Sequence, residues 1–314
     1  MNTLEQDNYL NLIYKCKDSK QAVLDFYDFK DSILPNKIYR YQKCSNKNID
    51  ALKNNYIWLS NPDEFNDLHD CKVNINSDLW VINNVFKHYD LSESETKLIF
   101  DLIHKVMTGL DFDIFTSTLT SEKYCRINEI LNPLNDITTY KEYYEKFKEY
   151  SNPHKEKPMK ISCWATCFSN KMDNILMWSH YANWNKGFCV EYDISKDLEF
   201  KHYLYPIIYL SAPIFKPELV GMEITISQTI FATSKCHTWA YEEEYRFFGK
   251  KSGKYTMTNK PSCLYLGKCI DKKDEQKLIK IAKSQGITTV KKMSTIPGRY
   301  ELSSEVVYTE ISQD

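Results

Sequence analysis

The stretch Trp239-Ala240-Tyr241-Glu242-Glu243-Glu244-Tyr245-Arg246-Phe247-Phe248 places three consecutive carboxylates and one arginine inside an aromatic run. It contains no helix-breaking residue, so we expect a strand whose successive side chains point to opposite faces. Glu242, Glu244 and Arg246 would then share one face. Charges on a face that is buried in an apolar core are costly. This face is therefore expected to border a cleft or to hold an ion-pair network, and a structural Glu–Arg pair at a sheet edge is the alternative.

The composition indicates a globular protein with no general affinity for nucleic acid or lipid. The 314 residues are 42% hydrophobic and 14% aromatic, enough for one large domain or two smaller ones. The net charge is −1, so no overall attraction to polyanions is expected. The N-terminus lacks the apolar core of a signal peptide, and no apolar run reaches the roughly 18 residues that span a membrane. The 10 cysteines include no Cys-x-x-Cys pair, which predicts reduced thiols in a cytoplasmic protein without a membrane partner or a metal site.

The order of the expected elements predicts an α+β fold. Two amphipathic helices over residues 3–30 would form a helical cap, residues 1–36, on a single domain of residues 37–314. A helical insertion is expected at about 77–157. The tail after residue 262 is expected to be β-α-β-β. Strands outnumber helices outside the insertion and mostly follow one another directly, which favours a mixed, mostly antiparallel sheet. The expected strands before the tail are 37–41, 56–60, 160–168, 187–192, 205–209 and 239–248.

Two further segments contribute candidate site residues. The loop after the second strand is rich in turn-forming residues, and with Phe65 anchored in the core it would aim Asn66 and Asp67 at a cleft. A short helix that we expect Asp173 to cap ends at His180 and Tyr181. Structural roles are the alternative for these residues, because turn Asx residues and single histidines are more often structural.

Five motifs in order resemble the bacterial and phage "domain of unknown function 2971" family. The resemblance covers roughly residues 37–310, and the helical stretch at 77–157 departs from the compact family pattern. It implies a cytoplasmic bacterial or phage protein, with a suspected role in defence or as a toxin, but no defined activity. The motifs are Tyr39-Arg40-Tyr41, Trp58-Leu59-Ser60-Asn61-Pro62 with Phe65-Asn66-Asp67, Met177-Trp178-Ser179-His180-Tyr181-Ala182, Lys186-Gly187-Phe188-Cys189-Val190-Glu191-Tyr192, and Tyr241-Glu242-x-Glu244-Tyr245-Arg246.

The first function hypothesis is an NAD-consuming ADP-ribosyltransferase or NAD glycohydrolase, whose fold is one candidate for the expected sheet. This sequence resembles such enzymes in the order of four features: an early Arg, a strand that contains a Ser, an aromatic residue that stacks on the nicotinamide, and a late Glu-x-Glu. Here these are Arg40, Ser162, Tyr181, Glu242 and Glu244. Glu244 would stabilise the oxocarbenium-like transition state, and Glu242 would position the acceptor. NAD is then the co-substrate, and a protein or nucleic-acid acceptor is left open.

Four more residues are assigned to substrate or cofactor binding: His180, Arg246, Asn66 and Asp67. The second hypothesis is a non-catalytic sensor or ligand-binding module, in which a buried polar network fixes the fold or binds a small ligand such as a nucleotide. That network would consist of Arg40, Asp67, His180, Glu242, Glu244 and Arg246. Both hypotheses require Arg40 and Glu244 on the same side of the sheet.

Two other chemistries receive less weight. Asp67, Asp70, Glu242 and Glu244 are a potential Mg²⁺ set for phosphodiester hydrolysis, although no lysine adjoins the glutamate pair as in common nuclease motifs. A Cys–His nucleophile is the weakest option, because the cysteines nearest the motifs lie on expected core strands, where cysteine behaves as a small hydrophobe.

Overall fold

The computed structural model describes residues 3–16, 19–67, 70–73, 159–160, 163–211 and 229–309. The chain forms two compact units: Met1–Cys71, Ile161–Ile214 and Ile224–Asp314 make up the first, and Lys72–Lys160 with Phe215–Glu223 the second. In the second unit, β3 (Lys72–Val73) and β4 (Met159–Lys160) pair antiparallel. The expected insertion at 77–157 and the candidate Ser162 lie outside the described residues.

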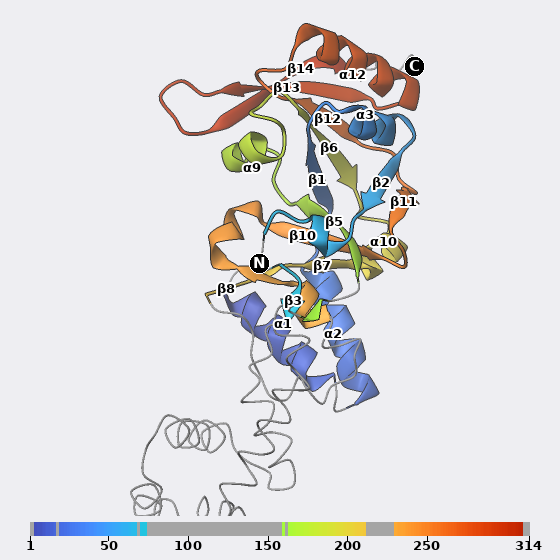
Figure 1. Cartoon of the computed structure of the whole chain (residues 1–314), viewed down its shortest axis with the longest axis vertical. Coiled ribbons are helices and arrows are strands. Elements are labelled where there is room, and N and C mark those ends of the chain that lie inside the picture. The colour runs from blue at the N-terminus through green and yellow to red at the C-terminus, as the bar shows by residue number, and fades with distance from the viewer. Residues whose placement is uncertain are drawn as a thin grey trace, which may run out of the picture. The chain divides into compact units, whose positions relative to one another are not determined.

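An eight-stranded sheet in the order β14-β13-β12-β6-β1-β5-β10-β7 forms the centre of the first unit (Figure 1). Neighbouring strands are antiparallel except β12 and β13, which are parallel. The α+β class with a mixed, mostly antiparallel sheet is therefore confirmed. The strands are β1 (Lys37–Gln42), β5 (Trp164–Ser169), β6 (Phe188–Asp193), β7 (Leu204–Pro206), β10 (Glu244–Gly249), β12 (Cys263–Leu266), β13 (Thr289–Thr295) and β14 (Leu302–Thr309).

Smaller elements surround this sheet. β2 (Tyr56–Leu59) pairs antiparallel with β11 (Gly253–Thr256), and β8 (Ile208–Leu210) pairs parallel with β9 (Ser234–Cys236). None of the helices in the described part of the chain is long and apolar enough to cross a membrane. The helices are α1 (Thr3–Lys15), α2 (Lys20–Ser32), α3 (Asn46–Lys53), α9 (Ile175–His180), α10 (Leu198–His202) and α12 (Lys272–Gln285), with short 3-10 helices η1 (Pro62–Glu64) and η5 (His237–Glu242).

One face of the sheet carries the main hydrophobic core. Ile38, Val190 and Leu264 come from three adjacent strands and are all buried. α12 packs Leu278 and Ile281 into the same core. The β-α-β-β tail expected from the sequence is present as β12, α12, β13 and β14. Its helix was predictable because the apolar residues of α12 recur at the spacing of one buried stripe.

The opposite face carries a smaller cluster around Trp178 of α9. Its ring is fully buried, its Nε1 donates to the Met172 carbonyl at 2.8 Å, and Tyr41 packs edge-on against it. α9 begins after Asn174, whose Oδ1 accepts hydrogen bonds from two backbone amides of the first turn. The expected cap at Asp173 was wrong by one residue, because the Asn174 side chain reaches those amides.

A left-handed turn connects α9 to β6. Asn183, Trp184 and Asn185 have φ values of 48°, 57° and 64°. The turn packs so closely on Gly267 that a Cβ there would lie 2.1 Å from the Asn185 carbonyl oxygen. A Cβ on Gly187 would lie 2.1 Å from the Gln42 carbonyl oxygen. These close approaches explain why positions 187 and 267 are both glycine.

The two N-terminal helices expected from the sequence are present as α1 and α2. Lys30 of α2 is fully buried, and its Nζ donates to the carbonyls of Lys201 at 2.7 Å and of Leu204 at 3.3 Å. The same ammonium pairs with Asp31 at 2.7 Å. This lysine thus ties α2 to the chain around the edge strand β7.

Candidate functional site

The segment expected as one strand over residues 239–248 has two parts. Residues up to Glu242 belong to η5, and β10 starts at Glu244. Glu243 lies between them in the left-handed region, with φ 43° and ψ 53°, and ends the 3-10 helix. The prediction of a strand was therefore wrong for the first half of this segment. An ion pair with Lys171 stabilises the turn at Glu243, and the Glu243 carbonyl accepts a hydrogen bond from the Asn170 backbone amide at 3.3 Å.

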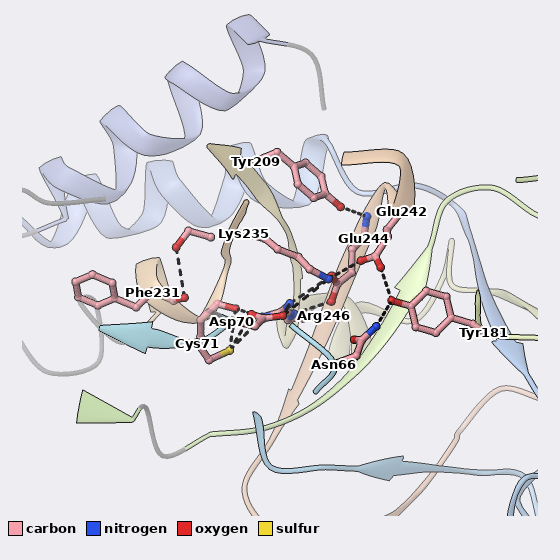
Figure 2. Close-up of polar contacts among 12 residues, drawn as sticks. Asn66, Asp70, Cys71, Tyr181, Tyr209, Phe231, Lys235, Glu242, Glu244 and Arg246 are labelled. Carbon is pink, nitrogen blue, oxygen red and sulfur yellow. Dashed lines mark hydrogen bonds and ion pairs between the residues drawn. The ribbon is translucent and has the colours of Figure 1, made fainter. Parts of the chain in front are cut away.

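Arg246 of β10 is the centre of a buried ion cluster. Its side chain is 0% exposed, and its Nη1 and Nη2 donate to the two oxygens of Asp70 at 2.7 and 2.6 Å. Its Nε donates to Glu244 Oε1 at 2.7 Å. This is the two-pronged geometry in which a guanidinium binds carboxylates most strongly. Figure 2 shows Asp70 and Glu244 gathered around the guanidinium.

Lys235 of β9 is the second cation of the cluster. Its Nζ donates to Glu242 Oε2 at 2.5 Å and to Glu244 Oε2 at 3.0 Å (Figure 2). Burial alone would lower the pKa of this ammonium, but Glu244 and Glu242 raise it well above its ordinary value. Lys235 is therefore a permanent cation rather than a proton acceptor or a nucleophile.

The two glutamates of the cluster differ in their affinity for a proton. Burial and the neighbouring charge of Glu244 raise the pKa of Glu242 to about 7. Burial acts in the same direction on Glu244, but Arg246 and Lys235 outweigh it and hold its pKa well below the ordinary value. The pair titrates together, and Glu242 is the member that exchanges a proton near neutral pH.

Glu242 also meets groups from other elements. The hydroxyl of Tyr181, after α9, donates to Glu242 Oε1, and Asn66 Nδ2 donates to the Tyr181 hydroxyl at 3.1 Å. Figure 2 shows Tyr181 and Asn66 approaching Glu242 from the side opposite Asp70. Burial and the Glu242 charge raise the pKa of Tyr181, so the phenol stays protonated.

The cluster residues other than Arg246, together with Tyr181 and Asn66, line a pocket of about 410 Å³. The pocket lies on the face of the sheet that carries the Trp178 cluster, because Tyr41 and Met177 of that cluster also line it. The volume is at the lower end of the range of about 300–1,000 Å³ for small-molecule sites. Four carboxylic residues and several aromatic rings surround it. The lining residues are Tyr39, Tyr41, Glu64, Phe65, Asn66, Asp70, Cys167, Phe168, Ser169, Met177, His180, Tyr181, Lys235, Glu242 and Glu244.

Arg40 lies on the other face. Tyr39 is opposite Ser169 of β5, which in turn is opposite Glu244 of β10, and residues directly opposite one another share a face. Because neighbours along a strand point to opposite faces, Arg40 points away from the pocket, and burial lowers its pKa. The expected cleft between Arg40 and Glu244 was therefore wrong, and both function hypotheses fail in the form that required these two residues on the same side of the sheet. Tyr39 occupies the position in β1 that faces the pocket.

The structure brings the other predicted site residues together in part. Asn66, His180, Tyr181, Glu242 and Glu244 line the pocket, and Arg246 lies directly behind it. His180 Nδ1 is 3.0 Å from the Tyr241 hydroxyl, at the exposed rim. Asp67 is not among the lining residues.

Sequence reasoning missed Lys235 and gave Asp70 only a metal-binding role. Asp70 binds Arg246 instead, and no group of His, Cys, Asp and Glu in the described residues is arranged to hold a metal ion. The one available signal for Lys235 was charge balance, because a buried pair of glutamates with a single arginine calls for a second cation. Nothing in the short Ser234-Lys235-Cys236 segment singles this lysine out.

Comparisons of the chain with protein-family models, with curated proteins and with solved structures return no significant match. The resemblance to the domain of unknown function 2971 family therefore stays a prediction. The function is argued below from the geometry of the pocket.

Proposed function

We propose that this protein is a ligand-binding module whose pocket holds a compact organic cation against the carboxylate of Glu242. The observation that carries the proposal is the charge imbalance of the cluster. Asp70, Glu242 and Glu244 provide three carboxyls, whereas Lys235 and Arg246 provide two cations. A bound cation would complete the balance and keep Glu242 ionised.

Tyrosine rings around the pocket support the same ligand chemistry. Tyr39, Tyr41 and Tyr181 all line it. The negative faces of aromatic rings attract ammonium and guanidinium groups, by about 0.5–1 kcal/mol at exposed sites and about 2 or more when the cation is desolvated. Rings combined with an undercompensated carboxylate favour an organic cation over a strongly hydrated metal ion.

Phosphate-bearing ligands fit this pocket less well. Within the described part of the chain, Lys235 is the only lysine or arginine that lines it, and its ammonium is already bound by Glu242 and Glu244. Recognition of a phosphate usually relies on arginine or lysine donors that are free to reach it. The charge distribution therefore favours a cation or a neutral polar molecule.

An NAD-consuming enzyme is the second candidate, favoured by the proton affinity of Glu242. The nicotinamide ring of oxidised NAD is itself a cation, and the pKa of Glu242, about 7, suits a group that stabilises charge or moves a proton near neutral pH. In this version Glu242 takes the role expected of Glu244, which is held by Arg246. Arg40 has no part in it, and the pyrophosphate would extend outside the pocket.

Titration calorimetry with the cations choline, agmatine and 1-methylnicotinamide as probes, at pH 8 and pH 5.5, tests the first candidate. We expect binding of at least one probe that weakens about 30-fold at pH 5.5, because a carboxyl with a pKa of about 7 is then almost fully protonated. Glu242→Gln should abolish binding, whereas Glu191→Gln, outside the pocket, should preserve it. Binding that is unchanged by pH and by Glu242→Gln, or no binding of any probe, contradicts the proposal.

Release of nicotinamide from NAD, measured in parallel, tests the second candidate. Nicotinamide that forms with the wild-type protein and not with Glu242→Gln supports catalysis. Probe binding without nicotinamide release supports a binding module, so the two outcomes are distinguishable.

A further inference from the structure

One of the carboxylates that line the pocket lacks a counter-charge. In the described part of the chain, the Glu64 carboxylate has neither a hydrogen bond nor an ion pair. The other three carboxylic residues of the lining are bound by Lys235 or Arg246. With Glu64 included, four carboxyls lie around two cations, and the difference of two negative charges is left for a ligand to balance.

The backbone that carries Glu64 is held in place. The Glu64 amide donates to the Asn61 carbonyl at 2.9 Å, and the Phe65 amide donates to the Pro62 carbonyl at 3.0 Å. Pro62 is buried, and the Phe65 ring lies over the Arg246 guanidinium, 5.2 Å from its central carbon. Because the turn is already formed, little backbone entropy is lost when a ligand meets this carboxylate.

Glu64 and Glu242 line the pocket at different depths. The Glu242 side chain is 3% exposed, whereas Glu64 is exposed and belongs to the mouth. Asn66, two residues after Glu64, donates to the Tyr181 hydroxyl at 3.1 Å, and this hydroxyl donates to Glu242 (Figure 2). Two residues of chain span at most about 7 Å. One elongated small molecule can therefore contact both carboxylates.

The rest of the pocket wall suits an organic dication better than a metal ion. Tyr39, Tyr41 and Phe65 line the pocket together with the other aromatic residues. Aromatic rings pack on methylene groups and attract ammonium groups with their faces. Hydrated divalent metals instead need several oxygen ligands around one point. Across the described residues, no group of His, Cys, Asp and Glu is arranged in that way.

We propose that the ligand of this pocket is a linear diamine. One ammonium group binds Glu242 at the buried end, the methylene chain packs along the aromatic wall, and the second ammonium group binds Glu64 at the mouth. This inference rests on the proposed function and narrows its organic cation to a dication. Glu64 is then the residue that selects a diamine over a monoamine.

Titration calorimetry at pH 8 and low salt, with diamines from butane-1,4-diamine to octane-1,8-diamine, tests the inference. Each is compared with the amino alcohol of the same length, and all amines are protonated because their pKa is close to that of lysine, about 10.4. At the best length we expect the diamine to bind about tenfold more tightly. About twofold arises because either end can enter, and about fivefold from the exposed ion pair with Glu64. Affinity should peak at one length, because the carboxylates are held at a fixed separation.

Two variants assign this preference to Glu64. Glu64→Gln should reduce the affinity ratio of diamine to amino alcohol to about two, the statistical factor alone. Asp63→Asn is the matched control, because Asp63 is an exposed neighbouring carboxylate that does not line the pocket, and it should leave the ratio unchanged. Both positions are exposed, so neither change disturbs the core.

The outcomes separate this inference from the proposed function. A ratio of about two in the wild-type protein, or a ratio that Glu64→Gln does not change, overturns the diamine. If the amino alcohols still bind and Glu242→Gln abolishes that binding, the proposed function stands without it. No binding of any amine overturns both.

Discussion

Glu191 and Glu242 are both buried on the same face of the sheet, yet their surroundings shift the pKa of the carboxyl group in opposite directions. Glu191 accepts hydrogen bonds from Lys37 at 2.8 Å, Ser262 at 2.8 Å and Tyr265 at 2.9 Å. Burial raises its pKa, but these three donors outweigh burial and the pKa is lowered. Glu242 shares its cation with a second glutamate, and its pKa is raised to about 7.

The difference lies in the number of charges that compete for each cation. Lys37 pairs with one buried carboxylate, whereas Lys235 pairs closely with Glu242 and Glu244 and lies 3.9 Å from a third, Asp70. A satisfied carboxylate stabilises the fold and has little affinity left for a ligand. An undercompensated carboxylate that faces a pocket is instead a candidate functional group. The local balance of charge, more than burial, therefore separates the structural glutamate from the functional one.

The largest effect is expected from removing a cation at each site. Arg246→Met leaves Asp70 and Glu244 buried without their main partner and should lower the free energy of unfolding by about 3–5 kcal/mol. Lys37→Met should lower it by at most about 1 kcal/mol, because the Lys37 side chain is 51% exposed. Urea unfolding followed by tryptophan fluorescence measures both, and equal losses would refute the distinction between the two sites.

The pH dependence should have opposite signs at the two glutamates. The pKa of Glu242 is higher in the folded protein, about 7, than its ordinary value of 4.5. Its contribution to stability is thus fully present below about pH 4.5 and is lost as pH rises through 7. Glu191, whose pKa is lowered, contributes stability above its ordinary pKa that is lost as the pH falls through its folded value.

Replacing each glutamate by glutamine makes this contrast measurable. At pH 8, Glu242→Gln should raise the free energy of unfolding by about 1–3 kcal/mol, and Glu191→Gln should lower it by a similar amount. The gain in Glu242→Gln should vanish well below pH 4.5, where Glu242 is protonated in both the folded and the unfolded state. Urea unfolding over this pH range gives the result, and changes of the same sign in both variants would contradict the comparison.

The smallest effect concerns one hydroxyl at each site. Tyr181→Phe removes a donor from the already undercompensated Glu242 and should shift its titration upward by about 0.5–1 pH unit. Tyr265→Phe leaves Glu191 with Lys37 and Ser262, so it should remain ionised at neutral pH. NMR titration of ¹³C-labelled glutamate carboxyls measures both, and an unshifted Glu242 in Tyr181→Phe would remove Tyr181 from the site.

Local sequence patterns were reliable for the fold and for part of the site. The apolar stripe of α12 and the two N-terminal helices depend on periodicity within a few residues. The Glu-x-Glu-x-Arg pattern also identified three members of the ion cluster, because buried charges in an aromatic run need partners. The prediction of a strand through Glu243 was wrong, because an ion pair with Lys171 stabilises a left-handed turn that local propensity disfavours.

The sequence by itself determined the α+β class and the presence of a charged site on the strand that contains Arg246. Only the tertiary structure decided which face each residue occupies, since the pairing of β1, β5 and β10 directs Tyr39 to the pocket and Arg40 away from it. It also brought Lys235, from a separate short strand, between two glutamates. Strand register and charge balance depend on residues far apart in the chain, and a local pattern does not contain that information.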